Sequence, residues 1–254
     1  MSKIKIQAQN LTIAYGDNVI LHNLNFKVTA QDIFMIMGAS GCGKSSLLKV
    51  LIGLKVPFKG NVLIKGKNFY TADKSQQQLI RQNCGILYQS GALFSTMTVR
   101  ENVALPLERY SDYSKKMIAE LVELKLAMVG LYGYENFYPD ELSGGMKKRA
   151  ALARAIALDP EILYFDEPSS GLDPVSSRLL DELILELNTN LQLTMVIISH
   201  DIASILNTGN QAIYLDTITK TITAQGNPKE WIKNPPNAAV ADFFNVDTRC
   251  DDAQ

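Results

Sequence analysis

The sequence has few cysteines, no long apolar run and no recognisable leader segment. Its three cysteines, Cys42, Cys84 and Cys250, form no C-x-x-C pair, and an odd, scattered set suits a reducing compartment better than a disulfide or zinc framework. No stretch approaches the roughly 18 apolar residues of a membrane-spanning helix, and residues 1–10 lack the apolar core of a signal peptide. We therefore expect a cytosolic protein that acts at a membrane only through a partner.

The chain also lacks an excess of charge of either sign. Its 25 lysines and arginines nearly balance 26 acidic residues, and the formal net charge is −1. Without a strong positive field, binding of nucleic acid or anionic lipid is disfavoured, and we expect no nucleic-acid partner. What the chain does have is apolar content: 46% of its 254 residues are hydrophobic. That is enough for the core of one large α/β domain with an inserted subdomain.

One stretch has the pattern of a phosphate-binding loop. Residues 38–45 read G-x-x-x-x-G-K-S, between an unbroken apolar run at 33–37 and apolar residues at helical spacing over 46–52. The glycines let backbone N–H groups point at phosphate oxygens, Lys44 adds a cation, and Ser45 offers a hydroxyl to Mg²⁺. We predict that this loop binds a nucleoside triphosphate. The residues predicted to contact it are Gly38, Ala39, Ser40, Gly41, Cys42, Gly43, Lys44, Ser45 and Ser46.

Strands precede this loop and form a predicted antiparallel layer. Residues 4–8, 11–15 and 19–28 have strand-like patterns, and the last two flank a turn at 16–18. Tyr15 ends its strand just before this turn. One interpretation is that its ring stacks on a nucleotide base. The alternative is that Tyr15 is an ordinary tyrosine of a β-strand with no role in binding.

Polar residues follow directly after two predicted core strands. Gln89 comes after the strand at 85–88, and His200 comes after the strand at 194–198. The C-terminal ends of parallel strands form the edge of an α/β sheet where ligands bind. His200 is therefore placed to donate a hydrogen bond to a γ-phosphate.

Two carboxylates end another apolar strand, predicted at 162–167. Asp166 is suited to hold Mg²⁺ through its waters, and Glu167 to orient an attacking water. A solvated pair of acids at a strand end is the alternative. The loop that follows ends at Asp173, which is predicted to cap a helix that has Pro174 in its first position.

From residue 90 to about 159 the pattern becomes helical. Apolar residues recur at helical spacing in three stretches, 99–107, 113–128 and 146–158. Ser143 is a good cap for the last of these helices, and Gly144 and Gly145 leave its first N–H groups uncovered. A second anion site is one interpretation, and a capped, alanine-rich core helix is the other.

Together these features resemble the nucleotide-binding subunit of ATP-binding cassette (ABC) transporters over nearly the whole chain. The resemblance rests on Gly38–Ser45, Gln89, the signature-like Leu142–Met146, Asp166, Glu167, Ser170–Asp173 and His200. It implies an α/β fold, with a P-loop NTPase (RecA-like) core, an antiparallel β layer and an inserted helical subdomain. It also implies ATP and Mg²⁺ as cofactors, and a homodimer in which Ser143 and Gly145 of one chain bind the γ-phosphate held by the other.

The same resemblance assigns roles to individual residues. Glu167 polarises the water, His200 clamps the transition state, Gln89 senses the γ-phosphate and the permease, and Lys44 holds the phosphates. The implied metal-site residues are Ser45, Gln89 and Asp166. Further implied nucleotide contacts are Tyr15, Ser143, Gly144, Gly145 and Asp173.

A narrower resemblance concerns the transported substrate. Residues 88–94, 97–103 and 146–155 are similar to the ATPase of Mla/MCE-type phospholipid transporters, including Met146, where ABC proteins usually have glutamine. Members of that family work with an integral permease, a periplasmic MCE-domain protein and often a small STAS-domain subunit. They lie at the cytoplasmic face of the inner membrane and power phospholipid movement between two membranes, which maintains the lipid asymmetry of the outer membrane.

Two other functions compete with this interpretation. The ATPase of a polar amino-acid importer uses the same catalytic residues. An ABC protein that acts on DNA or ribosomes is less compatible, because residues 90–142 contain no sustained heptad and the chain has a single cassette without internal repeat.

We expect a single ABC ATPase domain over residues 1–254. Its core comprises about 1–89 and 160–230, its helical subdomain about 90–159, and its C-terminal tail about 231–254. In the tail, Val240, Phe243 and Phe244 fit one face of a short helix. They either pack back onto their own cassette, with a frayed polar end, or reach across to a second subunit.

Overall fold

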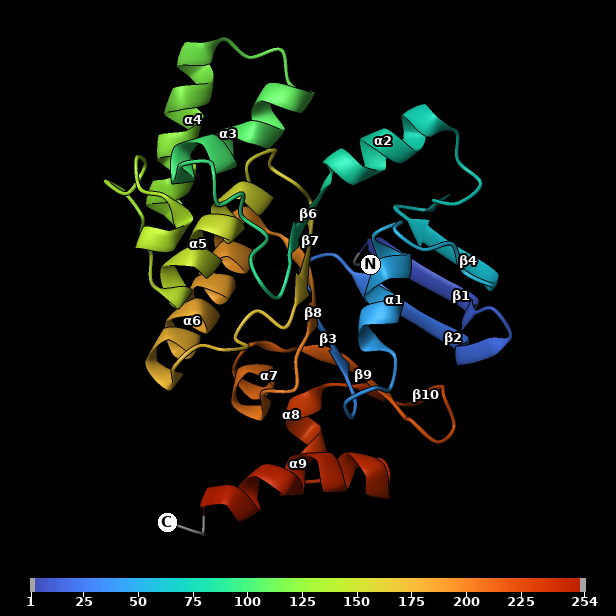
Figure 1. Cartoon of the computed structure of the whole chain (residues 1–254). Coiled ribbons are helices and arrows are strands. Elements are labelled where there is room, and N and C mark those ends of the chain that lie inside the picture. The colour runs from blue at the N-terminus through green and yellow to red at the C-terminus, as the bar shows by residue number, and fades with distance from the viewer. Residues whose placement is uncertain (1–2, 252–254) are drawn as a thin grey trace.

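The computed structural model describes residues 3–251 and consists of two sheets with helices packed around them (Figure 1). The larger sheet has the strand order β10-β9-β3-β8-β7-β6. Its strands are β3 (Ile33–Met37), β6 (Cys84–Leu87), β7 (Ile162–Asp166), β8 (Thr194–Ile198), β9 (Gln211–Leu215) and β10 (Ile222–Gly226). All neighbours are parallel except β9 and β10. The C-terminal ends of β3, β8, β7 and β6 therefore share one edge, as predicted.

The smaller sheet is antiparallel and has the order β2-β1-β4-β5. Its strands are β1 (Ile4–Tyr15), β2 (Asn18–Thr29), β4 (Lys59–Ile64) and β5 (Lys67–Asn68). The two strands predicted before the first turn are in fact one strand, β1. Its pattern is interrupted because the pairing shifts near Asn10, whose φ of 47° is left-handed and whose N–H bonds to Asn25 Oδ1 at 2.8 Å.

Apolar side chains of the large sheet are buried on both faces. Phe34 and Ile36 of β3 pack with the small sheet and with α1 (Lys44–Leu51). Met35 and Met37 pack on the opposite face, in a core shared with α6 (Pro174–Leu191) and α7 (Ile202–Thr208). Burial on both faces explains the unbroken apolar run before the phosphate loop.

Three further helices pack together on one side of the large sheet (Figure 1). They are α3 (Val99–Tyr110), α4 (Lys115–Met128) and α5 (Gly144–Ala155), the last preceded by a 3₁₀ turn at Pro139–Glu141. Thr98, Ser114 and Ser143 cap them with their side chains. Within residues 3–251, no helix is long and apolar enough to cross a membrane.

Some elements have no counterpart in the sequence prediction. Helix α2 (Lys74–Gln82) has only two apolar residues, Leu79 and Ile80, which are too few for the repeated spacing that predicts a helix. Helix α7 and strands β9 and β10 are short; the two strands pair within the large sheet, and α7 packs with α6.

The C-terminal part of the chain contains α8 (Pro228–Trp231) and, in the tail, α9 (Ala238–Asp251). Val240 and Phe244 are buried in the core of their own chain, and the Phe243 ring lies 5.6 Å from the Tyr214 ring. The first interpretation of the tail is therefore the one this structure supports. Helix α9 continues to Asp251, into the polar end that was predicted to fray, and residues 252–254 lie outside the described part of the chain.

Candidate functional site

The predicted phosphate loop surrounds the N-terminus of α1. Gly43 caps this helix with a φ of 103° and no side-chain cap, so its first N–H groups are uncovered. Gly38 has a φ of 144°, and a Cβ built on it would lie 2.4 Å from the Leu215 carbonyl oxygen. The Lys44 ammonium donates to the carbonyl oxygens of Gly38 at 2.7 Å and Ala39 at 3.0 Å. The loop thus brings the buried Lys44 ammonium and the free backbone N–H groups together at the N-terminus of α1, as phosphate binding requires.

A cavity of about 630 Å³ opens over this loop, within the size range of small-molecule sites. Its lining residues are Ile20, Gly38, Ala39, Ser40, Gly41, Gly43, Lys44, Ser45, Ser46, Glu167, His200 and Phe243. The structure therefore brings Glu167 and His200 to the predicted phosphate loop. Cys42 is the exception within the loop: its side chain is buried and does not line the cavity, and burial raises the pKa of its thiol.

Glu167 is held between two of the predicted catalytic residues. Its Oε1 lies 3.2 Å from His200 Nδ1, and its Oε2 accepts from Gln89 Nε2 at 3.4 Å. Gln89 also donates to Ser170 Oγ at 3.2 Å. The three side chains meet because β6, β7 and β8 are neighbours and end at the same edge. This arrangement fixes the carboxylate from two sides, beside the phosphate loop.

Asp166 is the last residue of β7 and is half-buried. Burial raises the pKa of its carboxyl, the adjacent Glu167 raises it further, and the charges of Lys49, Lys148 and Lys44 oppose this rise. In residues 3–251, no group of three or more His, Cys, Asp or Glu residues could hold a metal ion. The Ser45 hydroxyl and the Asp166 carboxylate are the hard oxygen ligands that Mg²⁺ prefers, and phosphates and water normally supply the remainder. The residues present fit a nucleotide-dependent Mg²⁺ ion.

Tyr15 lies at the end of β1, close to the phosphate loop. Its hydroxyl is 3.5 Å from Ser46 Oγ, and its side chain is about half exposed. The Lys55 ammonium lies 3.8 Å from the centre of its ring. A cation therefore covers part of the ring that was predicted to stack on a base.

Four predicted nucleotide contacts lie away from this cavity. Ser143 Oγ accepts from the Met146 N–H at 3.3 Å, and Asp173 Oδ1 accepts from the N–H groups of Val175 and Ser176, so both side chains cap helices. The Ser176 hydroxyl lowers the pKa of Asp173, and these capping bonds lower it further. Gly144 and Gly145 lie next to Leu172 and Ser176 at the start of α6. None of these residues lines the cavity of its own chain.

Two residues at the site were missed by the sequence analysis. Lys148 is buried on α5 and donates to the carbonyl oxygen of Gln89, and at 3.5 Å to that of Glu167. Burial lowers the pKa of its ammonium, while Asp166 and Glu167 counteract this effect. Phe243 of α9 lines the cavity. The pattern of the tail predicted an apolar face, but it could not show which surface that face would meet.

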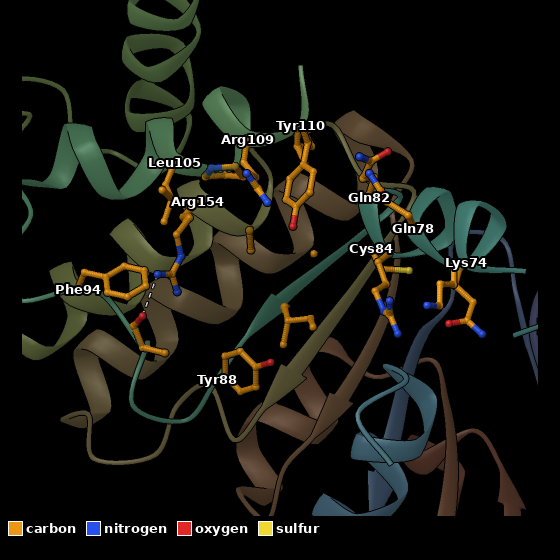
Figure 2. A pocket seen from close by; sticks show the side chains of 18 residues that line it. Lys74, Gln78, Gln82, Cys84, Tyr88, Phe94, Leu105, Arg109, Tyr110 and Arg154 are labelled. Atoms are coloured by element: carbon orange, nitrogen blue, oxygen red, sulfur yellow. Dashed lines mark hydrogen bonds between the residues drawn. The ribbon is translucent and has the colours of Figure 1, made fainter. Parts of the chain in front are cut away.

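A second, larger cavity of about 1090 Å³ lies between α2, β6, α3 and α5 (Figure 2). Tyr88, Phe94 and Leu105 contribute apolar surface. Its charged lining residues are Lys74, Arg81, Arg109 and Arg154, and no acidic residue lines it. We call this cavity the cationic groove.

Comparisons with known proteins give matches to a protein family, to individual proteins and to solved structures. A family model described as ABC transporter matches residues 21–170. A Haemophilus influenzae protein named intermembrane phospholipid transport system ATP-binding protein MlaF is 40% identical over 92% of this chain and 88% of its own length. A Mycobacterium tuberculosis protein named probable ribonucleotide transport ATP-binding protein mkl is 40% identical, over 78% of this chain and 55% of its own. A dimeric post-hydrolysis cassette bound to ADP and Pi has a TM-score of 0.78 at 30% identity, covering 87% of this chain and 98% of that one.

Proposed function

The chain belongs to the ABC transporter family of ATPases, and we propose that it powers phospholipid transport between the inner and outer membranes through a separate permease. The observation that carries the ATPase function is the convergence of Lys44, Glu167 and His200 on one cavity. The phospholipid substrate is supported by the 40% identity to MlaF over nearly the whole chain.

Within this function, each group at the cavity has a distinct task. The uncovered N–H groups of α1 and the Lys44 ammonium bind the phosphates of ATP. Glu167 accepts a hydrogen bond from the attacking water, and His200 and Gln89 fix the orientation of its carboxylate. Ser45, Asp166 and Gln89 would hold a Mg²⁺ ion, and such an ion would supply positive charge to the phosphates. Tyr15 lies at the edge of this site and stacks on the base once the nucleotide enters.

The active form is a homodimer. Ser143, Gly144 and Gly145 present uncovered N–H groups at the start of α5, and Asp173 lies across from them, but no phosphate loop of the same chain faces them. A second copy supplies that phosphate loop, and its own signature segment, residues 142–146, completes the first copy's site. The dimeric ADP-bound cassette that resembles this chain supports the arrangement.

The permease docks on the cationic groove, which is open to solvent and lies beside Gln89 at the end of β6. With this docking, we infer that the chain works at the cytoplasmic face of the inner membrane. An MCE-domain protein and a STAS-domain subunit complete the complex, as they do in the family that the sequence resembles.

A transport assay tests the substrate. The chain is purified with its permease, placed in lipid vesicles, and supplied with ATP and either a fluorescent phospholipid, a ribonucleotide or a polar amino acid. We expect ATP-dependent transfer of the phospholipid only, and none with Glu167→Gln. Transfer of the ribonucleotide or the amino acid instead would assign the chain to another class of transporter.

A further inference from the structure

Two cations of α5 bind the backbone that follows β6. The Lys148 ammonium donates to the Gln89 carbonyl oxygen, and the Arg154 guanidinium donates to the carbonyl oxygens of Gly91 at 2.9 Å and Ala92 at 2.8 Å. Figure 2 shows the bond of Arg154 to this backbone as a dashed line. One helix thus holds most of the short segment 89–92, which connects β6 to the helical part of the chain.

Lys148 also reaches the catalytic carboxylate's own loop. Its ammonium lies 3.5 Å from the Glu167 carbonyl oxygen, so a single side chain joins α5, Gln89 and Glu167. The backbone of Glu167 has a φ of 48°, a left-handed conformation that is unfavourable for this residue and depends on its surroundings. A donor bound to its carbonyl helps to keep that conformation.

The partners of Lys148 are unusual for a buried lysine. Lys125, the other lysine buried in the helical part of the chain, is paired with the Asp159 carboxylate. Lys148 is only 6% exposed, and among residues 3–251 no carboxylate forms an ion pair with it. A buried charge without partners is costly, and the partners of the Lys148 ammonium are two backbone carbonyls of the catalytic loops. Lys148 therefore favours the loop positions in which both carbonyls can accept its hydrogen bonds.

Helix α5 is a rigid connection between Lys148 and the signature segment. Ser143 caps the helix, and Lys148 lies in its second turn, about 7.5 Å further along the axis. A shift of the capped end therefore moves the ammonium as well. In the proposed dimer that end binds the phosphate held by the second copy.

We propose that Lys148 is a positioning residue that couples the signature end of α5 to the catalytic loops, by setting the backbone positions of Gln89 and Glu167. Arg154 anchors the same segment from the opposite end of the helix. The inference rests on the roles proposed above for Gln89 and Glu167. It predicts that Lys148 affects hydrolysis without contacting ATP.

The test compares variants of the full chain in steady-state ATPase and ATP-binding measurements with Mg²⁺. Lys148→Met should lower kcat by about 10- to 100-fold, the cost of misplacing a catalytic group slightly. The Kd for ATP should stay near that of the wild type. Lys148→Arg should recover most of the activity, because a guanidinium also donates to carbonyl oxygens. Lys147→Met is the matched control, since Lys147 is the neighbouring lysine and pairs with Asp140 at the surface.

Hydrogen exchange provides a readout that does not depend on activity. Lys148→Met should increase amide exchange in segment 89–92, both with and without ATP, whereas Lys147→Met should not. If Lys148→Met fails to fold, Lys148→Gln takes its place, because its shorter side chain cannot bridge both carbonyls.

Three outcomes would overturn the inference. They are a wild-type kcat in Lys148→Met, an equal loss of ATP affinity and kcat in Lys148→Met, or a Lys148→Arg variant as inactive as Lys148→Met. Glu167→Gln, measured in parallel, separates this failure from that of the proposed function. Full turnover in Glu167→Gln would reject the proposed catalytic roles, whereas loss in Glu167→Gln with none in Lys148→Met would reject only the coupling.

Discussion

Helices α1 and α5 both have glycine at their N-termini, as the cap Gly43 of α1 and as the first residues Gly144 and Gly145 of α5, yet their surroundings differ. At α1, the loop before the helix folds back over its N-terminus, and Lys44, Glu167 and His200 line the cavity above it. At α5, Ser143 uses its hydroxyl to cap the helix, and the first residues lie against the start of α6 at the surface. The two ends share their backbone chemistry but not their neighbours.

This difference shows why a helix N-terminus alone does not make a site. Free N–H groups attract an anion at either end. Only at α1 does the same chain add a buried cation, a carboxylate and an imidazole that can act on the bound group. In the proposed homodimer, the α5 end would therefore act only on a phosphate that another chain presents to it. The following predictions test that asymmetry.

The largest effect is expected at the α1 site. Glu167→Gln should reduce the ATPase rate by about 10²- to 10⁴-fold, the usual contribution of a positioned general base, with ATP affinity nearly unchanged. The variant should also accumulate as an ATP-bound dimer, visible as a shift in size-exclusion chromatography. Loss of ATP binding equal to the loss of turnover would contradict the role of Glu167.

A somewhat smaller effect is expected from the cation of the same site. Lys44→Ala should weaken ATP binding by about 10- to 100-fold, because a charged hydrogen bond contributes about 1.5–3 kcal/mol. Equilibrium ATP binding measures this change. Lys115→Ala is the control, since Lys115 is exposed on α4 and does not line the cavity; a similar loss there would indicate a general charge effect.

Mixing two inactive variants tests whether α5 acts on a second copy. When Ser143→Arg chains are mixed with Lys44→Ala chains, each heterodimer has one site with both lesions and one site with neither. With half of the dimers mixed, about a quarter of the wild-type ATPase rate should return. The control is each variant alone, measured at an ATP concentration that does not saturate Lys44→Ala, where each should show little activity. Full activity of Ser143→Arg by itself would show that α5 has no role in catalysis.

The smallest effect on turnover is expected from α9, which packs beside the α1 site. Phe244→Ala should destabilise the chain by about 3 kcal/mol in urea unfolding, because Phe244 is buried against its own core. ATPase activity of the folded protein and its dimerisation should change little. Phe58→Ala, at an exposed phenylalanine, should cost less than about 0.5 kcal/mol. A loss of dimer without loss of stability would show that α9 serves a second subunit.

Much of the α1 site could be predicted from local sequence. The phosphate loop, the two carboxylates at the end of β7 and the histidine after β8 follow directly from motifs, because parallel strands bring their C-terminal residues to one edge. The helix caps Ser143 and Asp173 were predicted as well, since capping depends on neighbouring residues only. Each of these features depends on residues that are close in the sequence, and the local backbone geometry largely fixes how they are arranged.

Contacts between distant segments could not be predicted in this way. Three features depend on packing across the whole chain. They are the orientation of the Glu167 carboxylate between Gln89 and His200, the position of α9 at the cavity wall, and the binding of Lys148 to two loop carbonyls. Helix α2 was missed because its two apolar residues are too few for the repeated spacing that predicts a helix. The sequence by itself determined the phosphate-binding chemistry and the edge where it occurs. Only the tertiary structure decided which helix holds the catalytic loops, because burial of the Lys148 ammonium is a property of the assembled core.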